Sequence, residues 1–224
     1  MAHASVVRNL CNDSGKYESE PSMDEASSAT VPEAAVPAPH FGKPVVVALI
    51  GLPGAGKSVV AQALVDQLGL RRVCRDAIRH GMFPKCSYSF AEKRAAFRGL
   101  LLALEINCML GQSSVIDGVT FSRRRDLLRV DAAIRRYHFT PVPVYLECPP
   151  DLARARIAAD VASNVHLARD RTTDVVGEVL TRFDPPPPNA LVVNAALPAT
   201  DVCRLVVDAI VKIRNPDAIT PSPA

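Results

Sequence analysis

The sequence predicts an α/β fold in which a parallel β-sheet lies between two layers of helices. Short apolar segments alternate with longer amphipathic segments from residue 45 to about residue 214, and such alternation is typical of a parallel sheet covered on both faces. The first apolar segment, Val45–Ile50, is a continuous run rich in β-branched residues, as expected for a strand buried on both sides. The length of 224 residues suits one domain of this kind.

The elements of the first half follow from the spacing of apolar residues, at three or four positions in helices and in short runs in strands. In order, we expect a helix from Lys57 to about Leu68, a short strand near Val73, a short helix from Ala77, a long helix over Phe90–Leu110 and a strand over Ser114–Asp117.

The second half continues the alternation. We expect a helix over Arg123–Tyr137, a strand over Val142–Glu147, a helix over Asp151–Val161, a polar stretch over 162–172, a helix over Asp174–Arg182, a strand over Leu191–Asn194 and a helix over Asp201–Arg214. The four prolines at 185–188 end the helix before them, and Thr200 is a candidate N-cap for the last helix.

The domain boundaries are predicted from composition. Residues 1–43 are rich in Ser, Ala, Pro and Glu without any periodicity, which predicts a disordered leader. The folded domain is expected over 44–214, and the Pro-rich residues 215–224 are expected to form a flexible tail.

Charge, cysteines and hydropathy limit the classes of partner and location. The net charge is +3 for the chain and +6 for residues 44–224, which suits an anionic ligand such as a nucleotide but does not by itself indicate nucleic acid. Six scattered cysteines without a CxxC pair favour a reduced, cytoplasmic setting. No apolar run reaches 18 residues, so we expect no membrane span.

The strongest functional motif is a GxxxxGK[ST] segment between the first strand and the first helix. It consists of Gly51, Leu52, Pro53, Gly54, Ala55, Gly56, Lys57 and Ser58. Glycines allow backbone N–H groups to surround phosphate oxygens, and the helix N-terminus adds a positive dipole. Lys57 can reach the terminal phosphates and the Ser58 hydroxyl can bind Mg²⁺. The segment predicts a binding site for ATP or a close relative.

A second candidate is the Arg-Asp-x-x-Arg pattern formed by Arg75, Asp76 and Arg79 at the end of the second strand. Ligands of open α/β folds bind at the C-terminal edge of the sheet. Asp76 could therefore accept the proton of an attacking hydroxyl, and Arg79 could hold an anionic part of the substrate. The structural alternative is that Asp76 only caps the helix beginning at Ala77.

A third candidate is Asp117, which ends the third strand and is soon followed by Arg123-Arg124-Arg125. Its carboxylate could take a water of the Mg²⁺ shell or orient the substrate; alternatively, it only satisfies backbone groups. Three arginines at a helix start oppose the helix dipole. This conflict suggests an anionic partner for one or two of them.

A fourth candidate is an arginine-bearing segment, with Arg154 and Arg156 on a helix and Arg169 and Arg171 in the polar stretch after it. An arginine segment that closes over a triphosphate would stabilise a phosphoryl-transfer transition state. Runs of charge more often form solvated helix faces.

Together these segments resemble a known family. The order GLPGAGKS, CRDAIR, VIDGVTFSRRR, LECPPDLARAR, RDRTTDVVGEVLTRFDPP and LVVNAALP is similar to P-loop kinases of the polynucleotide 5′-kinase and zeta-toxin type, also labelled AAA-family or AAA_33 proteins. The resemblance covers residues 45–212. It implies a P-loop NTPase three-layer sandwich with a five-stranded parallel sheet, a short helical lid at about 154–173, and an ATP:hydroxyl phosphotransferase.

The resemblance also implies residue roles. Lys57 and Ser58 would be phosphate and Mg²⁺ ligands, Asp76 the general base, Arg79 the substrate anchor, Asp117 and Arg125 active-site support, and Arg171 or Arg169 the lid arginine that acts on ATP. Two positions depart from the pattern: Ala77 replaces a second acid, and Asp160 stands where relatives often carry another lid arginine.

The sequence thus favours transfer of the γ-phosphoryl group of ATP–Mg²⁺ to a hydroxyl of a small molecule or a nucleic-acid end. An ATP-gated binding protein and a zeta-toxin-like kinase of nucleotide sugars are the alternatives. Asp76 discriminates against the first of these, because a switch does not need a carboxylate beside an acceptor site.

Overall fold

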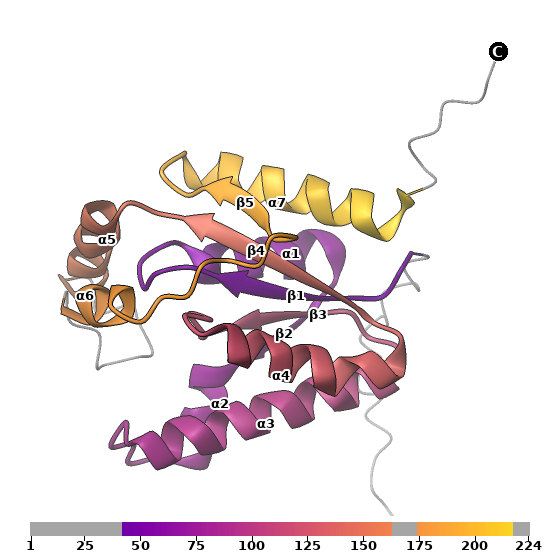
Figure 1. Ribbon diagram of the computed structural model, residues 1–224, viewed down its shortest axis with the longest axis horizontal. Helices are drawn as coiled ribbons and strands as arrows, with labels where there is room; N and C mark the ends of the chain where they lie inside the picture. The colour runs from indigo at the N-terminus through magenta and orange to yellow at the C-terminus, as the bar shows by residue number, and fades with distance from the viewer. Residues whose placement is uncertain (1–41, 163–173, 217–224) are drawn as a thin grey trace, which may run out of the picture. The chain divides into compact units, whose positions relative to one another are not determined.

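Five parallel strands form the central sheet of the computed structural model, which describes residues 42–162 and 174–216 (Figure 1). The order across the sheet is β2-β3-β1-β4-β5. The strands are β1 (Val45–Ile50), β2 (Arg71–Cys74), β3 (Ser114–Asp117), β4 (Thr140–Glu147) and β5 (Leu191–Asn194). The predicted parallel α/β sheet of five strands is therefore confirmed.

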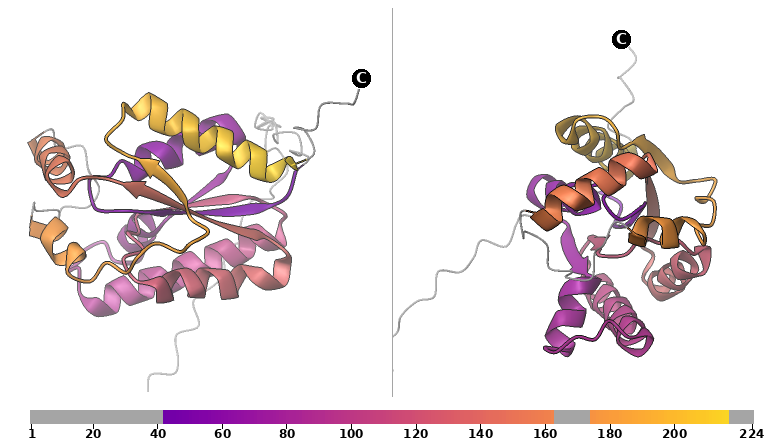
Figure 2. Two further views of the ribbon diagram at one scale, coloured as in Figure 1. Left: turned by 45° about the horizontal axis from the view of Figure 1, so that its top comes forward. Right: turned by 90° about the vertical axis from the view of Figure 1, so that its left-hand side faces the viewer.

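Helices cover both faces of this sheet, as Figure 2 shows. One face carries α1 (Lys57–Leu68) and α7 (Ala199–Arg214), which contact each other, and the other carries α3 (Phe90–Met109) and α4 (Arg124–Ile134). The remaining helices are α2 (Arg75–Met82), which packs on α3, and α5 (Pro150–Ala162) and α6 (Asp174–Leu180), which contact each other. A 3₁₀ turn, Arg135–Tyr137, follows α4.

Strand β1 explains why its sequence is apolar throughout. Side chains of a strand point alternately to opposite faces. Val45, Val47 and Leu49 belong to the core under α1 and α7, whereas the residues between them belong to the core under α3 and α4. All six residues of β1 are buried, as the sequence predicts for a strand covered on both sides.

The order of the strands determines where a ligand can bind. The chain passes from β1 to β2 and β3 on one side, and then crosses to β4 and β5 on the other. In open α/β sheets, such a reversal leaves a crevice at the carboxyl ends of the central strands. The GxxxxGK[ST] segment follows β1 at this edge, and Asp117 ends the neighbouring β3.

Helices α2 and α7 begin earlier than expected, and neither has the N-cap that the sequence suggested. Helix α2 begins at Arg75, with Cys74 as its N-cap and no side-chain capping bond. Asp76 therefore lies within the first turn, and the interpretation of Asp76 as the N-cap is wrong. Helix α7 begins at Ala199 after Pro198, again without a side-chain capping bond, so Thr200 is not the cap either.

Strand β4 begins at Thr140, before the expected start at Val142. It therefore contains Pro141 as well as Pro143. The backbone N–H of Thr140 donates to the Pro44 carbonyl at 2.9 Å. Because successive N–H groups alternate sides, the nitrogens of Pro141 and Pro143 face the other neighbour, and β5 pairs with β4 only from Val144 onward. The missing N–H groups therefore remove no ladder hydrogen bond.

Among the described residues, no helix combines the length and the apolar character needed to span a bilayer.

Candidate functional site

The loop between β1 and α1 is shaped by glycines. Gly54 has a φ of 82°, and a Cβ at this position would lie 2.4 Å from the carbonyl oxygen of Ala153 on α5. Gly56 is the N-cap of α1 with a φ of 87°, and a Cβ there would meet no atom within 4 Å. Both positions require the left-handed backbone that glycine adopts without strain. The first also allows α5 to approach the loop.

Lys57 lies in the concavity of this loop. Its side chain is buried, and Nζ donates hydrogen bonds to the carbonyl oxygens of Gly51 at 3.0 Å and Leu52 at 2.7 Å. A buried ammonium group must be paired or hydrogen-bonded. The loop carbonyls hold this charge at the first turn of α1, where the helix dipole also favours an anion.

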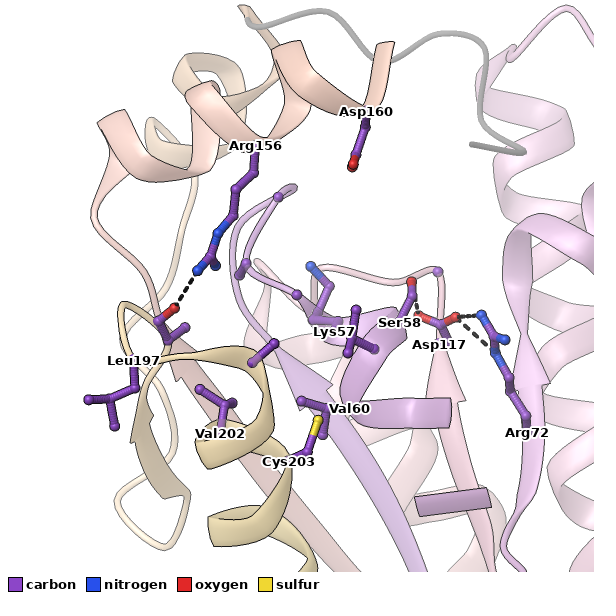
Figure 3. Close-up of a pocket in the computed structure, with 17 residues that line it drawn as sticks. Lys57, Ser58, Val60, Arg72, Asp117, Arg156, Asp160, Leu197, Val202 and Cys203 are labelled. Atoms are coloured by element: carbon purple, nitrogen blue, oxygen red, sulfur yellow. Dashed lines mark hydrogen bonds and ion pairs between the residues drawn. The ribbon is translucent and has the colours of Figure 1, made fainter. Parts of the chain in front are cut away.

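A cavity of about 470 Å³ extends from this loop to α7 (Figure 3). Its polar end is lined by Lys57, Ser58, Arg72 and Asp117. Its apolar end is lined by small and aliphatic side chains: Ala195, Leu197, Ala199, Val202 and Cys203. The cavity suits an elongated ligand with an anionic group at one end and an apolar ring at the other.

Three side chains from three elements meet at the polar end. Ser58 Oγ donates to Asp117 Oδ1 at 3.0 Å, and Arg72 Nε donates to Asp117 Oδ2 at 3.0 Å. Arg72 Nη2 also pairs with Oδ2. Burial by itself raises the pKa of Asp117, but the hydrogen bonds and charge of Arg72, with smaller contributions from Gly118 and Ser58, bring the pKa below its ordinary value. The carboxylate therefore stays ionised.

Arg72 is a site residue that the sequence analysis missed. It precedes Cys74 by two positions on β2, and Cys74 is in register with Asp117 on β3. Arg72 and Asp117 therefore share one face of the sheet. The available signal was a charged residue in a short strand. Arg72 stands next to Val73, which is buried.

The donor set of Ser58 and Asp117 fits Mg²⁺. Both groups supply hard oxygen atoms, and Mg²⁺ in phosphate-binding sites uses one or two protein oxygens together with waters and phosphate oxygens. Within the described ranges, no cluster of three or more His, Cys, Asp or Glu side chains could hold a metal by itself. A metal at this position would therefore be shared with a phosphate ligand.

Asp76 lies beside the polar end of the cavity. It is 9 % exposed, and Oδ1 lies 3.2 Å from Arg79 Nη2 and 3.5 Å from Arg75 Nη2. Gly118, which lines the cavity, packs directly against it, because a Cβ at Gly118 would lie 3.2 Å from Asp76 Oδ2. The structure thus brings Asp76 next to Asp117 through the glycine that follows β3.

Arg79 is buried beneath the surface that a ligand would contact. Its side chain is only 4 % exposed, it pairs with Asp76, and its guanidinium lies over the Tyr88 ring at 4.4 Å. Such a cation–π contact fixes the orientation of the guanidinium plane. In this arrangement Arg79 holds Asp76 in place; its predicted contact with a substrate stays a prediction.

The arginine run at the start of α4 has an anionic partner inside the chain. Asp184 accepts a hydrogen bond from the backbone N–H of Arg124 at 2.8 Å and pairs with Arg123 at 3.4 Å. Arg125 is 72 % exposed, lies 4.0 Å from Asp126 and does not line the cavity. The expected anion is therefore a side chain for Arg123, whereas Arg124 meets Asp184 through its backbone N–H alone. The structure does not bring Arg125 to the other site residues.

The arginine-bearing segment is described only in part. Arg169 and Arg171 lie outside the described residues. Arg156 on α5 lines the cavity and donates through Nη2 to the Ala195 carbonyl at 3.0 Å, and Asp160 lines the cavity one turn further along (Figure 3). Arg154 pairs with Asp151 at 2.8 Å and does not line the cavity.

Comparison with known proteins identifies relatives of this fold. Residues 46–186 match the family model AAA_33, which is described as an AAA domain. No curated protein matches the sequence.

Solved structures of the same fold carry names of kinases. A provisionally named kinase from Chloroflexus aurantiacus J-10-fl is 22 % identical over 77 % of this chain and 98 % of its own, with a TM-score of 0.60. A gluconokinase from Sinorhizobium meliloti 1021 is 14 % identical over 77 % of this chain and 95 % of its own, with a TM-score of 0.58. The APS kinase CysC of Mycobacterium tuberculosis, in complex with AMPPNP and APS, is 19 % identical over 75 % and 98 %, with a TM-score of 0.53. At these identities the likeness shows the fold, and the predicted P-loop NTPase architecture is confirmed.

Proposed function

The chain belongs to the AAA_33 family of AAA domains, and on this premise we propose that it is an ATP-dependent phosphotransferase that moves the γ-phosphoryl group of ATP–Mg²⁺ to a hydroxyl group. The observation that carries the proposal is the place of the Asp76 carboxylate, against Gly118 and beside the polar end of the cavity. A carboxylate at this point is where an acceptor hydroxyl would need a base.

The nucleotide is expected to lie along the cavity. Its phosphates would bind the backbone N–H groups of residues 54–58 and the Lys57 ammonium, which the loop carbonyls already hold at this place. The adenine ring would occupy the apolar end between α1 and α7, near Leu197 and Val202. Arg156 lines the cavity from α5 and is fixed to the Ala195 carbonyl.

Ser58 and Asp117 are the residues proposed to hold Mg²⁺. The ion would supply positive charge to the β- and γ-phosphate oxygens. Asp117 is well suited to this place because its carboxylate stays ionised and its Oδ1 atom already lies 3.0 Å from Ser58 Oγ.

In the transfer step, the acceptor oxygen forms a bond to the γ-phosphorus while the bond from that phosphorus to the β-phosphate oxygen breaks, leaving ADP. Asp76 accepts the proton of the acceptor hydroxyl, and Arg79 holds Asp76 in position. Lys57 and the loop N–H groups stabilise charge on the phosphoryl oxygens, which is the larger part of catalysis in such reactions. Arg171 and Arg169 are proposed to close on the triphosphate.

The solved structures support a kinase and leave the acceptor open. Their names include a gluconokinase and an APS kinase, whose acceptors differ in chemistry. For this chain, we propose a hydroxyl-bearing small molecule or nucleic-acid end. An ATP-gated binding protein is the second candidate, and a kinase of nucleotide sugars is a third.

A transfer assay tests the proposal. The purified protein is incubated with γ-labelled ATP and Mg²⁺ together with nucleosides, sugars, nucleotide sugars, aminoglycosides and 5′-hydroxyl oligonucleotides, and label on each acceptor is measured. We expect transfer to at least one class and a strongly reduced transfer by the Lys57→Ala variant. ATP binding without transfer to any class would favour the ATP-gated protein instead.

A further inference from the structure

Arg72 has no part in the proposed reaction, although it lines the cavity. Its guanidinium is held on two sides. Nε and Nη2 bind Asp117 Oδ2, and Nη1 donates to Gln62 Oε1 at 3.2 Å. Gln62 in turn donates through Nε2 to Asp66 Oδ1 at 2.8 Å on the same helix. Helix α1 and strands β2 and β3 are thereby joined through one arginine.

In this arrangement the two carboxylate oxygens of Asp117 have different partners. Oδ2 receives both guanidinium nitrogens, whereas Oδ1 accepts from the Ser58 hydroxyl and takes no bond from Arg72 (Figure 3). Asp117 is 2 % exposed, so little solvent competes with Arg72 for Oδ2. Both guanidinium N–H groups converge on Oδ2, and this charge-assisted contact restrains the carboxylate through that one oxygen.

We propose that Arg72 is a positioning residue that reserves Oδ1 of Asp117 for the metal and thereby makes the site select Mg²⁺ over Ca²⁺. The proposal rests on the proposed function, in which Ser58 and Asp117 hold the metal of ATP. Arg72 itself contacts neither the metal nor the transferred group in this arrangement.

The selection follows from coordination chemistry. Mg²⁺ takes an octahedral shell and needs few protein oxygens, whereas Ca²⁺ takes six to eight oxygens and readily uses both oxygens of one carboxylate. With Oδ2 occupied by Arg72, Asp117 can offer only Oδ1. Loss of Arg72 would free Oδ2, which favours Ca²⁺, and would release the orientation of Oδ1, which disfavours Mg²⁺.

Equilibrium binding of ATP in the presence of Mg²⁺, Ca²⁺ or EDTA tests the proposal by calorimetry, without any assay of turnover. Arg72→Gln should weaken the apparent Mg²⁺ affinity of the ATP-bound protein about 10–100-fold, the usual cost of losing a partner of a metal ligand. The ratio of Mg²⁺ to Ca²⁺ affinity should fall, and ATP binding in EDTA should not change. In an Asp117→Asn background, Arg72→Gln should add no further loss of selectivity.

Arg71→Gln is the matched control, because Arg71 is the neighbouring arginine of β2, is exposed and bonds to Gln112 through Nε at 3.3 Å. It should behave as the wild type. Arg72→Lys keeps the positive charge beside the buried Asp117 but lacks the fork, so it should fold and still lose selectivity. It decides the question if Arg72→Gln does not fold.

Two results would overturn the proposal. One is an unchanged ratio of Mg²⁺ to Ca²⁺ affinity in a folded Arg72 variant. The other is an equal loss of ATP affinity in EDTA and in Mg²⁺, which would make Arg72 a phosphate ligand. A wild-type protein that does not bind ATP under any of the three conditions would instead contradict the proposed function.

Discussion

The buried charges of the site are each held by an internal partner. Lys57 donates to two loop carbonyls, Asp117 pairs with Arg72, and Asp76 pairs with Arg79. Removing one member of such a set leaves the other buried and uncompensated, which is destabilising by itself. Variants that keep the size and hydrogen bonding of a side chain are therefore the informative ones at this site.

Asp76→Asn separates a base from a structural partner. The amide keeps the size of the side chain and its contact with Gly118, but it cannot accept a proton. We expect the transfer rate to fall roughly 10²–10⁴-fold, the range for losing general base catalysis. ATP affinity should persist, because residues 51–58 are not changed. Unchanged transfer would rule out Asp76 as the base, and an equal fall of transfer and affinity would indicate a damaged site.

Lys57→Ala tests the phosphate site itself. The variant removes the only side-chain ammonium that lines the cavity among the described residues. We expect transfer to fall by at least about 10²–10³-fold, as for loss of one preorganised donor. Because Nζ also bonds to Gly51 and Leu52, the melting temperature is measured alongside. A folded variant with wild-type turnover would contradict the assignment of this loop.

At the scale of elements, the turn after β3 connects the metal position with the base. Gly118 has a φ of 72°, and a Cβ there would lie 3.0 Å from the Asp76 backbone nitrogen and 3.2 Å from its Oδ2. Glycine adopts this backbone without strain and leaves room for α2 to approach β3 this closely. The spacing between Asp117 and Asp76 therefore depends on a residue without a side chain.

Gly118→Ala should displace Asp76 and lower transfer more than ATP affinity. Gly111→Ala is the matched control, since Gly111 has a φ of 69° but an added Cβ would meet no atom within 4 Å. Both variants should lose roughly 1–2 kcal/mol of stability from the left-handed backbone, whereas only Gly118→Ala should lose transfer. Equal transfer by the two variants at matched stability would show that the contact with Asp76 does not matter.

The elements that the sequence predicts correctly are those with a strong local signal. β1 has a continuous apolar run, and α1 begins directly after a glycine-rich turn at Lys57, as observed. The start of α2 was placed too late because Asp76 is a residue type that favours the N-cap, whereas the actual N-cap, Cys74, makes no side-chain capping bond. In β4, only the start at Thr140 and Pro141 was missed, because a sequence does not reveal on which side of the strand a neighbour is absent.

At the scale of the whole domain, contacts between distant segments were the part that local patterns could not predict. The P-loop and Asp76 are visible as motifs, whereas the pairing of Arg72 with Asp117 depends on β2 lying beside β3. Asp184 reaches the start of α4 from sixty positions further along the chain. Such pairs carry no local periodicity. Their discovery required the order of the strands.

The cavity joins elements from across the domain, and this predicts a response of the whole molecule to ligand. Its lining comes from α1, β2, β3, α5 and the segment from β5 into α7. ATP–Mg²⁺ would therefore bind only when the half of the sheet with β2 and β3 and the half with β4 and β5 are both assembled. A ligand that binds only the folded state at one hundred times its Kd stabilises that state by about 2.7 kcal/mol. For a domain of this size, each kcal/mol raises the Tm by about 2–4 °C, so a rise of roughly 5–10 °C is expected.

Thermal unfolding with and without ATP–Mg²⁺ measures this rise. The Lys57→Ala variant should show a much smaller shift at the same ligand concentration, because the phosphates lose the ammonium group of the loop while the apolar end between α1 and α7 stays intact. Adenosine should give only a small shift with both proteins, since it fills the apolar end alone. An equal rise with adenosine and with ATP–Mg²⁺ would place the binding energy outside the phosphate loop and contradict the proposed site.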